Sequence, residues 1–282
     1  MTITAFELLD TDPTSADIIT TRTLLHESIP LTGSIMSGTY GTLTAGGNIK
    51  NYSHGMFQSV YDYPYLSSSA NHIFDITVGY DESSVFSGSS NRVQQKKKIN
   101  MYNQFSQVLL GYTGSTNRVR EFELDLSLDN AGTWGGSRST VCKDGVFLNF
   151  SRLITKDQIK MGTFSITVGY GPWLTPFGAS GQRVLSDSKT TTSSGSAQTM
   201  GGDYGVLYDT SSAPRGVVFY ESGIVLLSGS AFKSDIASSS VGFYVHPTLG
   251  SQTYEQAMTG SSISGSCDAI RHRIRNVAFN NS

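Results

Sequence analysis

The stretch "FDITVGY", residues 74–80, recurs almost unchanged as "FSITVGY", residues 164–170. Both copies are rich in β-branched and aromatic residues, and their Phe, Ile and Val side chains at alternate positions share one face of an extended strand. The repeat therefore predicts two equivalent core strands. Two related β halves and the convergence of two unrelated core strands both remain open as its origin.

Composition extends this prediction to the whole chain. The 282 residues can bury a real core in one large or two modest domains. Thirty glycines, 14 Tyr and 14 Phe are typical of a turn-rich β protein with aromatic buried area. A net charge of −2, with 15% charged residues, does not favour nucleic acid or an anionic membrane. The first residues, "MTITAFELLDTDP", lack a basic start and an apolar core, so no Sec-type signal is expected.

We predict a mainly β chain, an antiparallel β-sandwich or meander, in four parts. Residues 1–48 are broken by prolines and glycines and are expected to form an extended N-terminal arm. Residues 49–178 form a β-rich region containing one amphipathic helix, 97–110. Residues 179–202 are expected to form an exposed Gly/Ser loop, and residues 203–282 a β-meander followed by a basic C-terminal segment.

The helix is predicted from one apolar stripe, which comprises Met101, Tyr102, Phe105, Val108 and Leu109. Residues 96–98 are three lysines on the unfavourable side of the helix dipole. They indicate a solvated basic turn or a contact with an acidic neighbouring subunit.

Two further segments carry local predictions. Residues 121–128, "EFELDLSL", alternate as a strand with one dry and one wet face. After a strand ending at Phe150, Thr155 and Gln158 resemble a capping box and predict one short helical turn.

Enzyme signatures are scarce. The sequence contains no phosphate-binding loop, no G-x-S-x-G elbow and no H-E-x-x-H, and its five histidines are never four residues apart. Glu123 and Asp125 would lie about 7 Å apart on one strand face, within the range for glycoside hydrolysis, but strand alternation explains them equally. Cys142 and Cys267 predict a free, buried pair, with a disulfide as the alternative.

Aromatic and basic residues offer candidate binding surfaces. Tyr61, Tyr63 and Tyr65, with Trp134 and Trp173, could stack on sugars or fill cores and interfaces.

The C-terminal "DAIRHRIRNVAF", residues 268–279, indicates a surface helix or edge strand with solvated arginines, or an interface arm. The candidate subunit-interface residues are Ile3, Phe6, Leu8, Leu9, Ile18, Ile19, Leu24, Leu25, Arg271, Arg273 and Arg275.

Four blocks of the sequence carry a resemblance: residues 48–80, 96–111, 146–169 and 216–232. They resemble a family of virion structural proteins of T4-like marine myophages, chiefly those that infect cyanobacteria. The resemblance implies a non-enzymatic component of the contractile tail or baseplate, assembled in symmetric copies in the host cytoplasm. A receptor- or glycan-binding tail module and a head or neck decoration protein are the alternatives, and a cell-wall glycosidase would rest on Glu123 and Asp125 alone.

The expected partners are other virion proteins and copies of the chain itself. No nucleic acid, membrane, cofactor, metal or catalytic residue is expected, while glycan binding remains open.

Overall fold

The computed structural model describes residues 49–61, 71–88, 92–112, 119–123, 141–171, 176–178, 181–188, 199–233, 244–246, 250–252, 254–260, 262–271 and 273–282. The predicted arm (1–48), most of the predicted strand 121–128, and Tyr63, Tyr65, Trp134 and Trp173 lie outside these residues.

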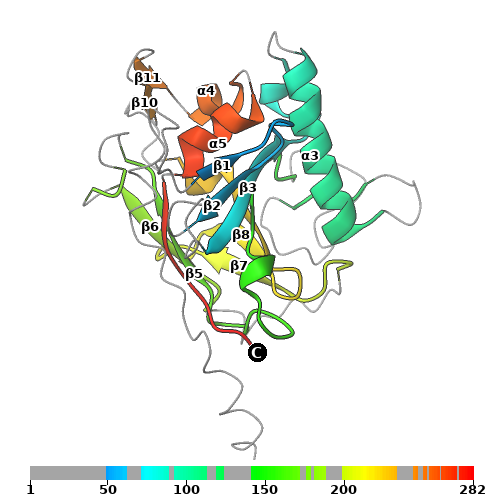
Figure 1. Cartoon of the computed structure of the whole chain (residues 1–282), viewed down its shortest axis with the longest axis vertical. Coiled ribbons are helices and arrows are strands. Elements are labelled where there is room, and N and C mark those ends of the chain that lie inside the picture. The colour runs from blue at the N-terminus through cyan, green and yellow to red at the C-terminus, as the bar shows by residue number, and fades with distance from the viewer. Residues whose placement is uncertain are drawn as a thin grey trace, which may run out of the picture.

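Ten of the described strands form one antiparallel sheet (Figure 1) in the order β1-β2-β3-β4-β9-β8-β7-β6-β5-β12. The strands are β1 (Ile49–Asn51), β2 (Gln58–Tyr61), β3 (His72–Tyr80), β4 (Asp144–Asn149), β5 (Ser165–Gly169), β6 (Gln182–Ser186), β7 (Tyr204–Tyr208), β8 (Pro214–Phe219), β9 (Ile224–Ser228) and β12 (Ile274–Ala278). A separate ribbon pairs β10 (Tyr244–His246) with β11 (Gly250–Gln252). The mainly β prediction is confirmed. A sandwich is not, because the core strands belong to one sheet.

The repeated heptapeptide supplies two core strands, as predicted. The first copy lies in β3, between β2 and β4, and the second lies in β5, between β6 and β12. Phe74, Ile76 and Val78 of β3 share a buried cluster with Ile166 and Val168 of β5. Strands distant in the sheet order thus contribute to one core, which requires the sheet to curl around it.

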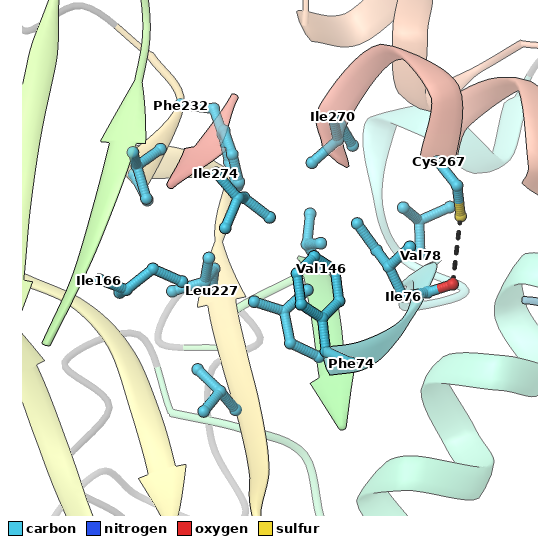
Figure 2. Close-up of a cluster of buried hydrophobic side chains, with 14 of the residues drawn as sticks. Phe74, Ile76, Val78, Val146, Ile166, Leu227, Phe232, Cys267, Ile270 and Ile274 are labelled. Atoms are coloured by element: carbon cyan, nitrogen blue, oxygen red, sulfur yellow. Dashed lines mark hydrogen bonds between the residues drawn. The ribbon is translucent and has the colours of Figure 1, made fainter. Parts of the chain in front are cut away.

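Figure 2 shows this inner core. Side chains from β3, β4, β5, β9 and β12 converge there with Ile270 and Cys267 of helix α5 (Ile263–Arg271). The Cys267 thiol lies 3.5 Å from the backbone oxygen of Ile76. The short helix α4 (Tyr254–Met258) adds Met258 to the same cluster. The inner face is therefore closed by two helices from the C-terminal part of the described chain.

A second, smaller core lies on the outer sheet face under helix α3 (Arg92–Leu110). Tyr102 and Leu109 of the helix pack there with Phe147, Val217 and Leu226, which neighbour one another across β4, β9 and β8. The helix begins five residues before the predicted start, at Arg92 rather than Lys97. Its predicted stripe is wrong at Val108, which is 63% exposed.

Three local predictions are corrected. No helical turn follows Thr155; a 3₁₀ turn, η4 (Ser151–Leu153), lies before it instead. The predicted exposed loop 179–202 contains β6, whose Leu185 is fully buried. Lys98, expected in a solvated turn, is 1% exposed.

The predicted meander is confirmed as β7, β8 and β9, and the C-terminal segment ends in β12, a terminal strand of the described sheet. Two further 3₁₀ turns are η2 (Val85–Gly88), which follows β3, and η5 (Gly229–Ala231), which follows β9.

Candidate functional site

A cluster of aromatic and ionisable side chains lies on the outer face of the first three strands. We call it the β1–β3 face; it comprises Lys50, Tyr52, His54, Phe57, Ser59, Tyr61, His72 and Asp75. Ser59 is registered opposite Asp75, whereas the neighbouring pair Val60 and Phe74 enters the inner core. Because strand side chains alternate, Ser59 and Asp75 point to the opposite side of the sheet.

Hydrogen bonds connect the polar members of this face. The Ser59 hydroxyl donates to Asp75 Oδ1 at 2.5 Å, and His72 Nε2 lies 2.7 Å from the same oxygen. The Tyr52 hydroxyl lies 3.0 Å from Ser59 Oγ. Burial alone raises the pKa of Asp75, but hydrogen bonds from His72 and Ser59, with electrostatic interactions with His72 and Arg152, lower it below its ordinary value. Asp75 therefore holds a negative charge at the centre of the face.

The order of these bonds does not make a hydrolase triad. In such a triad the imidazole lies between the nucleophilic hydroxyl and the carboxylate, so that it can take the hydroxyl proton. Here the carboxylate of Asp75 lies between Ser59 and His72. Ser59 donates a hydrogen bond to the carboxylate and has no imidazole beside it in this chain of contacts, so the serine–histidine pair of such a triad is not formed by these three residues.

Aromatic rings enlarge the face. Tyr52 stacks on His54 with centroids 5.2 Å apart and contacts Phe57 at 4.7 Å. Tyr61 meets His72 edge-on at 5.4 Å. Apart from exposed His54 the rings are half-buried, and Lys50 Nζ lies 5.2 Å from the centre of the Tyr52 ring. A surface of this kind can contact a protein or a sugar ring.

Of the residues predicted for subunit contacts, the eight apolar arm residues lie outside the described part of the chain. Two of the three arginines are not solvated as predicted: Arg271 is 1% exposed and Arg273 is fully buried. Arg271 donates to Gln58 and Asp268, which joins helix α5 to β2. A contact of Arg271 or Arg273 with a neighbouring subunit would require this packing to open.

Arg273 and Arg275 fix the C-terminal strand to its neighbours. Arg273 Nη1 donates to the backbone oxygens of Gly169, at 3.2 Å, and Gly171, at 2.7 Å. Half-buried Arg275 donates to Gln182 and lies 4.0 Å from the centre of the Phe177 ring. The basic segment is thus part of the fold.

Other buried charged groups also bind within the fold. Lys98 Nζ donates to the backbone oxygens of Met258 and Gly260 and to Ser266 Oγ. Burial lowers the pKa of Lys98 to about 8. Asp187 accepts bonds from the backbone of Gly162 and Phe164 and from the Tyr220 hydroxyl. Burial raises the pKa of Asp187, although these three bonds oppose the shift.

The remaining candidates from the sequence are placed as follows. Cys142 and Cys267 are free and buried, as predicted. Glu123 is only 6% exposed, so the prediction that it lies on a wet strand face is wrong; Asp125 is outside the described residues. The described ranges contain no group of three His, Cys, Asp or Glu residues that could hold a metal ion. Tyr61 does lie in the β1–β3 face.

Sequence reasoning did not find the rest of the face. The available signal was the alternation that sends Ser59 and Asp75 outward, and Asp75 occupies the one position at which the two heptapeptides differ. The contact between these residues depends on the β2–β3 register, which the alternation alone does not give.

No family model, curated protein or solved structure matches this chain. Among the described helices, none is long and apolar enough to span a membrane.

Proposed function

We propose that the chain is a non-enzymatic structural protein of a T4-like phage virion, assembled in symmetric copies in the contractile tail or baseplate. The observation that carries this proposal is the β1–β3 face, a connected set of half-buried aromatic and ionisable side chains beside β1, a terminal strand of the described sheet. Tyrosine is enriched in subunit interfaces, where its ring supplies contact area and its hydroxyl a hydrogen bond.

The resemblance to myophage virion proteins supports the same proposal. Its blocks correspond to β1 to β3, most of α3, β4 with β5, and β8 with β9. These elements frame both buried cores, so the resembling residues belong to the scaffold that presents the face.

The test is incorporation into particles. Tyr52 and Tyr61 are replaced together by alanine in a phage genome, and incorporation is measured by mass spectrometry of purified virions. Loss of two interface tyrosines should reduce incorporation at least tenfold, because interface tyrosines can each contribute more than about 1 kcal/mol. The matched control is Tyr112→Ala, which removes a tyrosine that is 54% exposed at the end of α3. Normal incorporation of the folded double variant would contradict the proposal.

The N-terminal arm is proposed as a second contact. Its apolar residues, from Ile3 to Leu25, would be buried against a neighbouring subunit. Deleting residues 1–20 should leave a folded protein that fails to enter particles; a truncated chain that unfolds, or that is incorporated normally, would argue against an arm between subunits.

Glycan binding is the second candidate function, and the same face favours it. Sugar-binding sites combine aromatic rings with carboxylate and other polar groups, and here Tyr61 and His72 adjoin Asp75. A glycan array probed with the purified protein and with Tyr61→Ala separates the two functions. Binding that the variant loses, together with normal particle incorporation, would favour the glycan module.

A further inference from the structure

A second polar region lies between helix α3 and the chain segments on either side of it in sequence. A pocket of about 180 Å³ is lined there by Asp81, Glu82, Asn103, Ser106, Arg120 and Glu121. These residues come from the turn after β3, from the middle of α3 and from residues 120–121. None of them belongs to the β1–β3 face, so the pocket is a separate feature.

Among the described residues that line the pocket, acidic side chains outnumber basic ones. Three carboxylates, from Asp81, Glu82 and Glu121, share it with one guanidinium, from Arg120. Arg120 also interacts electrostatically with the carboxylate of Glu123. This interaction offsets part of the positive charge that Arg120 brings to the pocket. Burial raises the pKa of neighbouring Tyr102 well above its ordinary value, and the charges of Asp81 and Glu121 raise it further. The local field therefore favours a cation.

An unpartnered hydroxyl lines the pocket. Ser106 is fully buried, and its Oγ has no hydrogen-bond partner among the described residues. Ser106 follows Asn103 by three residues and Tyr102 by four, a spacing that places all three on one face of α3, the face that lines the pocket. A buried hydroxyl without a partner costs about 1–3 kcal/mol, which a ligand that donates a hydrogen bond would recover.

We propose that this pocket binds a primary ammonium group of a small aliphatic amine. An ammonium group has three N–H donors and no acceptor, which complements carboxylates and an unpartnered hydroxyl oxygen. The carboxylates do not converge as a group of three that could hold a metal ion among the described residues, so their spacing suits a larger, hydrogen-bonding cation. Glu82 and Asn103, which line the same pocket as Ser106, are exposed, so the pocket is open to solvent on their side.

The test uses ethylammonium chloride, titrated into the intact chain at constant ionic strength and followed by amide proton–nitrogen NMR. Saturable shifts are expected at residues 81–82, 103–106 and 120–121, with weak, roughly millimolar affinity for so small a ligand. Tetramethylammonium is the matched ligand control, because it has the same charge but no N–H donor. It should bind at least tenfold more weakly.

Three variants localise the binding. Glu82→Gln should weaken it about tenfold and Ser106→Ala about fivefold, the effects expected for a charge-assisted and a neutral hydrogen bond. Asp157→Asn removes an exposed carboxylate elsewhere and should have no effect.

The proposal is overturned by unsaturated shifts, by equal binding of tetramethylammonium, by variants that bind like the wild type, or by calcium occupying the pocket more tightly than the amine. The comparison of the two ligands on the wild-type chain remains decisive if a variant does not fold. This test is independent of the proposed assembly role.

Discussion

At the residue scale, the glycine of the repeated heptapeptide has a steric explanation. A Cβ on Gly79 would lie 2.8 Å from the backbone nitrogen of Tyr102 and 2.9 Å from the backbone oxygen of Lys98. A Cβ on Gly169, the matching position of the second copy, would lie 2.7 Å from the backbone oxygen of Pro176. Both strands are thus approached closely by another backbone at the same position, and only glycine leaves room for it.

Gly79→Ala should therefore lower the free energy of unfolding by about 2–4 kcal/mol, because backbone atoms of α3 must move away from β3. Gly88→Ala is the control, since its added Cβ meets no atom within 4 Å; its effect should stay within about 0.5 kcal/mol. Urea denaturation followed by circular dichroism measures both. Equal midpoints for the two variants would show that the close approach has no energetic consequence.

Lys98→Met removes the donor to the backbone oxygens of Met258 and Gly260. Because these oxygens then lack a donor, the substitution should lower the free energy of unfolding by about 1–3 kcal/mol. Lys96→Met, at an exposed position, should leave the free energy of unfolding nearly unchanged.

The pH dependence of this stability difference has a defined sign. The pKa of Lys98 is lowered to about 8 in the folded state from an ordinary value of 10.5, so between these values the unfolded chain binds more protons. The contribution of Lys98 to the free energy of unfolding therefore rises with pH between these two values. The difference in free energy of unfolding between the wild type and Lys98→Met should increase between about pH 8 and pH 10. A difference that decreases over this range would contradict this assignment.

At the element scale, the C-terminal strand depends on a buried arginine. Arg273 bonds two backbone oxygens at the end of the β5 region, Gly169 and Gly171, and β12 pairs with β5 directly. A lysine carries a flexible point charge in place of a planar fork and cannot reproduce this geometry.

Arg273→Lys should accelerate hydrogen exchange of the amides in β5 and β12 about tenfold or more, the effect of losing one charge-assisted bond. Arg152→Lys, at an exposed position outside β5 and β12, is the control. Protection that is unchanged in β5 and β12 would show that Arg273 does not fix the strand.

The element scale also shows what sequence patterns can predict. Alternation and apolar content predicted both repeat strands and the meander, because the apolar residues of these strands face the two buried cores. Strand β6 was missed because its alternating residues lie in a segment rich in glycine and serine; Leu185 is buried in the inner core, and Arg183 is buried where it bonds the backbone of Ala231 and Lys233. Lys98 was expected in solvent because the partners of its ammonium group lie about 160 residues away. Long-range partners of this kind leave no local pattern.

At the scale of the whole molecule, one curled sheet carries a core on each face. The inner core is closed by α5 and β12, and the outer core is covered by α3 (Figure 1). The outer face of β1 to β3 instead carries half-buried aromatic and ionisable side chains. The two cores maintain the fold, and the β1–β3 face is the part of the sheet that we propose for contact. The resemblance alone could not locate this face.

A density map of the intact particle at medium resolution tests the proposed function most directly. The chain is fitted into the map, and the surroundings of Tyr52, Phe57 and Tyr61 are compared with those of Tyr112. The account predicts symmetric copies in the tail or baseplate, with the β1–β3 face buried against a neighbouring subunit. Absence of the chain from the particle, or a β1–β3 face that points into solvent in every copy, would contradict it.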